Sequence, residues 1–182
     1  KFSSYRQFAM ATLDDIYSPE ALEKALKYEA TALESGVLIN DGQARFSFHP
    51  LPWPAQISPG FGLVLTEVNG DGRPDLYMVQ NFFSPQPETG RMNGGLSVLL
   101  TGLGGARFEV VTPARSGLVV PGDAKGLTET DLNGDGWPDF VIATNNDELI
   151  VYEHRGMADG AVIRIDLLGR RGNRQAIGAR DR

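Results

Sequence analysis

The chain has 182 residues, of which 41% are hydrophobic, and carries a formal net charge of -6 at pH 7. This composition suits a folded acidic domain, and the lack of cysteine excludes disulfides and thiolate metal sites. No apolar run approaches the roughly 18 residues of a membrane-spanning helix, so we expect no membrane insertion. Because the chain begins at Lys1, without methionine or signal peptide, we expect a fragment or processed product.

The first 35 residues are predicted to form a helical segment. Ser18 and Pro19 are typical of a helix start, and Gly36 is typical of a helix stop. Between them an apolar stripe recurs at helical spacing, interrupted by Glu29: Leu22, Ala25, Leu26, Ala32 and Leu33. We therefore expect a helix over 18–36 that packs on another element, and a shorter helical stretch over 5–16.

From residue 36 onward the sequence is β-rich and contains an internal repeat. Arg45-Phe46 recurs as Arg107-Phe108, and the acidic segment 67–75 recurs as 131–139 at nearly the same spacing. Each unit is predicted to contain a strand, a Gly-rich turn, a strand beginning at Arg-Phe, a loop, a third strand, the acidic loop and a final strand. Four-stranded units in tandem are typical of β-propellers, which have about four to eight blades. We therefore expect a mainly β fold in which 36–160 form two blades, either part of a larger propeller or stabilised by the helical segment and the tail.

The two acidic segments, 67–75 and 131–139, have the pattern of calcium loops. Alternating oxygen-bearing side chains with glycine at position 6 suit a cation that takes about six to eight oxygen ligands. Position 7 would contribute its backbone carbonyl. The predicted ligands are Glu67, Asn69, Asp71, Arg73 and Asp75 in the first loop, and Asp131, Asn133, Asp135, Trp137 and Asp139 in the second.

Two other interpretations of these loops compete with calcium binding of this kind. An EF-hand needs Glu at position 12, where this chain has Met78 and Ile142, and the β-rich flanks indicate that the loops join strands. Asn-Gly and Asp-Gly also form tight turns without any metal. Three carboxylates in nine residues repel one another unless a cation offsets the charge, which favours metal binding. Glu67, one methylene longer than aspartate, would make the first loop the weaker site.

Two further segments are candidates for binding. The connection 81–95 is long and contains Phe82 and Phe83, so it is a candidate ligand loop, with a connector that covers the blade core as the alternative. The segment 161–182 has six arginines against two aspartates. These arginines are mixed with Leu, Ile and Gly and no aromatic accompanies them, so we expect solvated strand and loop and no nucleic-acid partner.

The segment from Phe61 through Leu76 resembles an FG-GAP or VCBS repeat, and Gly126 through Phe140 resembles a second copy. This resemblance covers roughly 36–154 and implies a β-propeller with calcium held between two blade strands. The first copy departs from the pattern at Glu67, and the second has Lys125-Gly126 in place of Phe-Gly. Ile163 through Arg180 is similar to the start of an ASPIC/UnbV domain, incomplete here, which implies a bacterial exported protein or a protein like cartilage acidic protein.

Catalysis has little support in the sequence, because the two histidines, His49 and His154, show no nucleophile or zinc spacing. We expect a non-enzymatic, calcium-binding propeller region of an extracellular, periplasmic or cell-surface protein. Its partners would be a protein or glycan on a propeller face and the remaining blades of the parent chain. The alternative is an accessory or catalytic domain of a polysaccharide-processing enzyme, which would place Glu88, Asp123 or Asp147 in one cleft. A purely structural repeat of a surface adhesin is the third possibility.

Overall fold

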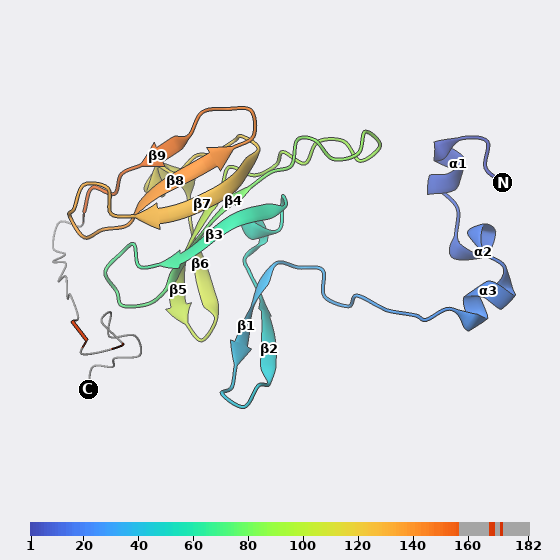
Figure 1. Cartoon of the computed structure of the whole chain (residues 1–182), viewed down its shortest axis with the longest axis horizontal. Coiled ribbons are helices and arrows are strands. Elements are labelled where there is room, and N and C mark those ends of the chain that lie inside the picture. The colour runs from blue at the N-terminus through green and yellow to red at the C-terminus, as the bar shows by residue number, and fades with distance from the viewer. Residues whose placement is uncertain (157–167, 170–171, 173–182) are drawn as a thin grey trace. The chain divides into compact units, whose positions relative to one another are not determined.

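The computed structural model describes residues 1–156, 168, 169 and 172, and the fold is mainly β with few helices, as predicted (Figure 1). It divides into two compact units, Lys1–Leu33 and Glu34–Arg182. The predicted ASPIC/UnbV-like segment, 161–182, lies outside the described residues apart from those last three positions. No helix within the described part is long and apolar enough to cross a membrane.

The first unit contains three short helices: α1 (Tyr5–Ala9), α2 (Leu13–Ile16) and α3 (Pro19–Lys24). The start of α3 is as predicted, because the Ser18 hydroxyl accepts a hydrogen bond from the Ala21 N–H at 3.3 Å. The prediction that this helix continues to Gly36 is wrong, because α3 ends at Lys24, and within the first unit it buries no residue against another element. Leu26 and Leu33 are 85% and 86% exposed. Without burial of the apolar stripe, a short helix has little to stabilise it in water.

The second unit contains three antiparallel sheets within its described residues. A hairpin pairs β1 (Gly36–Asn40) with β2 (Phe46–Pro50). The short helices η1 (Trp53–Ala55) and α4 (Pro113–Ser116) lie in connections. The four-stranded sheet is formed by β3 (Gly60–Thr66), β4 (Asp75–Gln80), β5 (Val98–Gly104) and β6 (Arg107–Val111). The three-stranded sheet is formed by β7 (Ala124–Thr130), β8 (Asp139–Thr144) and β9 (Ile150–Tyr152).

The strands are grouped differently from the prediction, which combined β1 and β2 with β3 and β4 in one unit. In the structure β3 and β4 share a sheet with the two strands that follow them. The pairing of β4 with β5 explains this grouping, because it places Leu76 opposite Leu100 and buries both. A four-stranded antiparallel sheet therefore exists, but its boundary is shifted by two strands. No closed propeller is present among the described residues.

The hairpins β3–β4 and β7–β8 have the same register. Thr66 pairs with Asp75 just as Thr130 pairs with Asp139, and the corresponding strands begin and end at equivalent positions of the sequence repeat. Both pairs also carry an irregularity near the start of the first strand, at Gly60/Leu63 and at Ala124/Gly126. The sequence repeat thus corresponds to two strand–loop–strand units of matching geometry.

The main core lies between the four-stranded and three-stranded sheets. Tyr77 on β4 contacts Phe140 on β8 with ring centroids 4.7 Å apart, and both side chains are buried. At the sheet edges β3 lies beside β7 (Figure 1), where a Cβ added to Gly62 would meet the Leu127 backbone N at 2.7 Å. A second cluster covers the other face of the four-stranded sheet: Leu51, Ala55, Leu76, Met78, Val98 and Leu100.

Candidate metal centres

The two acidic loops occupy corresponding places, since each joins the first and second strands of a unit. The first connects β3 to β4, and the second connects β7 to β8. Both therefore join two strands, as the sequence predicts, and the structure shows that these strands are antiparallel. Glycines at positions 4 and 6 of each loop have positive φ values, between 75° and 86°, which L side chains rarely adopt. Four glycines thus permit the tight winding of the two loops.

In the second loop, the side-chain oxygens accept hydrogen bonds from the loop's own backbone. Asp131 accepts from the N–H groups of Gly134, Asp135 and Gly136 at 2.7, 3.0 and 2.9 Å. Asn133 accepts from the Asp135 N–H at 2.9 Å. Asp135 accepts from the Trp137 N–H at 2.8 Å and from the Asn133 amide at 2.9 Å. The alternate side chains thus turn inward over one loop, the arrangement from which oxygen ligands could face a cation.

The first loop repeats this pattern with one difference. Asn69 and Asp71 accept from the N–H groups two residues on, at 2.9 and 2.8 Å. Glu67 uses a single oxygen, Oε1, to accept from the N–H groups of Asn69 and Gly70 at 3.0 and 2.7 Å. Its other oxygen, Oε2, is buried and has no hydrogen-bond partner in the protein. A buried carboxylate oxygen without a donor is costly, and a cation would satisfy it.

The closing aspartate of each loop is fully buried and ties the loop to the third strand of its sheet. Asp75 accepts from the N–H of Val68 at 3.0 Å and from that of Gly102 at 2.8 Å. Asp139 accepts from the N–H groups of Leu132 and His154 at 2.8 Å each. Each carboxylate therefore links the loop to a backbone N–H that lies in or just after the third strand.

The ionisation of these aspartates follows their surroundings. Burial raises the pKa of Asp75 above its ordinary value, against the lowering effect of the Gly102 and Val68 N–H groups, and the nearby charges of Glu67 and Asp71 raise it further. Asp135, at position 5 of the second loop, is exposed. Hydrogen bonds from the Trp137 N–H and the Asn133 amide hold its pKa below the ordinary value. A cation in the first loop would favour the ionised form of Asp75.

The residues at position 7 differ between the copies. Arg73 is exposed, whereas Trp137 is 9% exposed and stacks on His154, with ring centroids 4.8 Å apart. His154 Nε2 lies 3.0 Å from the Val68 carbonyl, which can only accept, so Nε2 donates, while Nδ1 accepts from the Gly156 N–H at 2.9 Å. The tryptophan and histidine thus connect the second loop to the first. No sequence signal indicates this role of His154, because Val68 lies far from it along the chain.

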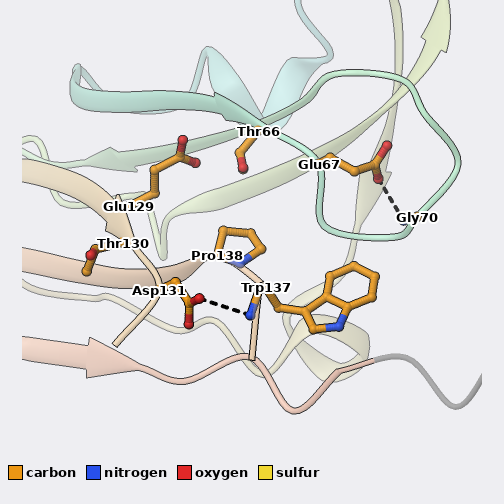
Figure 2. A pocket seen from close by; sticks show the side chains of 9 residues that line it. Thr66, Glu67, Gly70, Glu129, Thr130, Asp131, Trp137 and Pro138 are labelled. Carbon is orange, nitrogen blue, oxygen red and sulfur yellow. Dashed lines mark hydrogen bonds between the residues drawn. The ribbon is translucent and has the colours of Figure 1, made fainter. Parts of the chain in front are cut away.

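A cavity of about 510 Å³ opens between the two loops, and Figure 2 shows the side chains around it. Its lining combines three carboxylates with threonines and the second loop's aromatic and proline side chains: Thr66, Glu67, Gly70, Glu129, Thr130, Asp131, Gly136, Trp137 and Pro138. Two of these carboxylates, Glu67 and Asp131, already bind loop N–H groups. The acidic side chains that line the cavity therefore belong mostly to the two loops.

Within the described residues, no group of three or more His, Cys, Asp or Glu side chains is arranged to hold a metal ion. The carboxylates are turned toward backbone donors, as the hydrogen bonds above show. The donor set nevertheless fits calcium, because each loop brings three carboxylates and one amide oxygen into nine residues, and Glu67 Oε2 has no donor. Asp131, Asn133, Asp135 and Asp139, with the Trp137 carbonyl, would hold the ion in the second loop.

The connection 81–95, predicted as a ligand loop, is fixed to the sheets at its base. Asn81 is fully buried, and its amide donates to the carbonyls of Gly95, Pro121 and Gly122 at 2.8 to 3.1 Å. Lys125 donates to the Asn81 carbonyl at 2.6 Å, and its Nζ lies 3.4 Å from the centroid of the Phe61 ring. These contacts are those of an anchored connector.

Of the three carboxylates that an enzyme would use, Asp123 and Asp147 accept hydrogen bonds within the protein and Glu88 is exposed. Asp123 is 4% exposed, forms an ion pair with Lys125, and accepts from the Asn145 amide at 3.1 Å. Asp147 is exposed and accepts from the N–H of Glu148 at 2.9 Å. Neither Asp123 nor Asp147 lines the cavity between the loops.

Comparison with known proteins gives no assignment: no family model matches this sequence, and a search of curated proteins finds no match.

Proposed function

We propose that residues 36–160 form part of a calcium-stabilised β-propeller in an exported or cell-surface protein, whose role is to bind a protein or glycan without catalysis. The correspondence between the two acidic loops carries this proposal. They share a ligand pattern, lie at matching strand ends, and close on a buried aspartate that also binds the third-strand backbone or its continuation. A bound ion would stabilise the folded state by holding these strand ends together.

Thermal unfolding with excess calcium and with chelator tests the metal. A ligand that binds only the folded state stabilises it by about 2.7 kcal/mol at a hundredfold excess over its dissociation constant. We expect calcium to raise the midpoint, and Asp135→Ala to remove much of the gain. Asp147→Ala is the matched control, because it removes one exposed carboxylate outside both loops. Equal midpoints with calcium and with chelator in the unmodified chain would refute calcium binding.

A glycan array and an activity screen separate the functions. Binding without turnover supports recognition, whereas hydrolysis of a polysaccharide would support the alternative, an accessory or catalytic domain of a polysaccharide-processing enzyme. The engagement of Asp123 by Lys125 and Asn145 favours recognition, since a paired, buried carboxylate is poorly placed to act on a sugar.

A further inference from the structure

The repeat in the second unit extends beyond the two acidic hairpins. The strands β7 and β8 match β3 and β4 position for position. When the sequence is aligned so that Arg45-Phe46 matches Arg107-Phe108, β1 begins at the position where β5 begins. In the same alignment, the first and last residues of β2 fall within one position of those of β6. The β1–β2 hairpin therefore corresponds to the β5–β6 hairpin, and the surroundings of the two can be compared residue by residue.

The two hairpins differ at one edge. In the four-stranded sheet β5 pairs with β6 on one side and with β4 on the other. Within the described residues β1 pairs with β2 alone. The difference changes burial: Leu100 on β5 is fully buried, whereas its counterpart on β1, Leu38, is 62% exposed. An open strand edge with an exposed apolar side chain invites pairing with another strand.

A face of β3 is left open in the same way. On β7, Leu127 packs against β3, where a Cβ on Gly62 would meet the Leu127 Cβ at 2.7 Å. The counterpart of Leu127 on β3 is Leu63, which is 57% exposed. Phe61 and Leu65 lie two residues before and after Leu63 and therefore on the same face of the strand, and they are 42% and 56% exposed. An apolar row of Leu63 and Leu65 thus lies uncovered on β3 where the repeat places a neighbouring strand, whereas the Phe61 ring beside it already contacts Lys125 and Phe82.

One strand–loop–strand unit could cover both the free edge of β1 and the exposed face of β3. A strand–loop–strand unit of the β3–β4 kind would pair its second strand with β1, as β4 pairs with β5. It would pack its first strand on Leu63 and Leu65, as β3 packs on β7. We propose that the free edge of β1 and this apolar row form a docking surface for one further strand–acidic loop–strand unit. This inference rests on the proposed blade arrangement and specifies which surface is covered. In the expected register, Leu38 on β1 lies opposite the residue of the docked unit that corresponds to Leu76.

A second copy of this chain fits the surface less well. Its two strands of the required kind, β4 and β8, each lie between two hydrogen-bonded neighbours. A copy would have to open a sheet to supply either of them. A separate unit with its own strand–loop–strand sequence meets the requirement without that cost.

The experiment supplies such a unit within the full chain. A duplicate of residues 60–96 is inserted between Glu34 and Ser35, so that the inserted Leu96 precedes Ser35 as the original precedes Ser97. Amide hydrogen exchange is then measured on β1, with β6 as an internal reference edge strand. We expect the amides of β1 that β2 does not pair to exchange about tenfold or more slowly than in the unmodified chain.

Two matched variants test the contact. Leu38→Glu leaves the unmodified chain folded, because the side chain is exposed there, and it removes the gain in protection from the duplicated chain. Leu76→Asp confined to the inserted copy acts in the same way. The proposal is overturned if the amides of β1 exchange at the same rate in the duplicated and unmodified chains. It is also overturned if the protection of β1 in the unmodified chain increases with protein concentration, because that result identifies a second copy as the occupant. Calcium binding is measured separately, by titration of the unmodified chain. If calcium does not bind but β1 gains protection in the duplicated chain, the calcium proposal is refuted and the docking surface is supported.

Discussion

Substitution of Gly62 by alanine tests the contact between the edge strands β3 and β7. The added Cβ would lie 2.7 Å from the Cβ and from the backbone N of Leu127, so the two strands must separate. Overpacking of this kind costs about 1–3 kcal/mol. Restriction of the unfolded chain offsets about 0.4–1 kcal/mol of that loss. We expect a net loss of about 1–2 kcal/mol, because the obstruction includes backbone and cannot move as a side chain would.

The repeat supplies the control for this substitution. Gly126 occupies the position on β7 that corresponds to Gly62, but its added Cβ would meet the Ala143 Cβ at 3.3 Å and no backbone atom. Gly126→Ala should therefore cost less. Thermal unfolding measures both, and for a chain of this size a loss of about 1–2 kcal/mol lowers the midpoint by about 2–8 °C. A Gly62→Ala protein at least as stable as Gly126→Ala would refute the close approach of β3 and β7.

Two further predictions concern burial and charge. Leu100→Ala should destabilise by about 2–5 kcal/mol because the side chain is fully buried, whereas Leu38→Ala should cost less than about 1 kcal/mol, and urea unfolding compares them. For Asp123, burial acts to raise the pKa, but hydrogen bonds from Lys125, Asn145 and the Phe83 N–H outweigh it and hold the pKa below its ordinary value of 3.8. Its stabilisation is therefore complete above pH 3.8 and is lost as the pH falls through the lowered folded-state pKa. Asp123→Asn should show a smaller loss of stability on acidification than the unmodified chain, and an equal loss in urea titrations would contradict this assignment.

The sequence predicts the acidic hairpins well because their information is local. Glycine at fixed loop positions, alternating oxygen side chains and β-rich flanks all lie close together along the chain, and each has a physical reason to specify a strand–loop–strand unit. The strands β3 and β7 end directly before these loops, and β4 and β8 begin at the closing aspartates, Asp75 and Asp139. The calcium that the pattern predicts stays a prediction.

The errors arise where distant residues decide the outcome. The apolar stripe over 18–36 has helical spacing, yet α3 ends at Lys24 because no burial supports its continuation. The grouping of strands depends on the pairing of Leu76 with Leu100 across a long connection, and spacing alone does not reveal it. The bridge from His154 to Val68 likewise joins segments that have no common sequence motif.

The connections that follow β4 and β8 differ in length although the hairpins before them match. The connection after β4 runs over 81–97, whereas the one after β8 is much shorter and runs over 145–149. Both leave the strand at the end opposite its acidic loop, because the loop precedes the strand and the connection follows it. Insertions and exchanges at this end therefore lie away from the residues predicted to bind calcium. Beyond the anchoring Asn81, new surface chemistry can be acquired there by evolution or by grafting, while the opposite end of the unit carries the predicted calcium ligands.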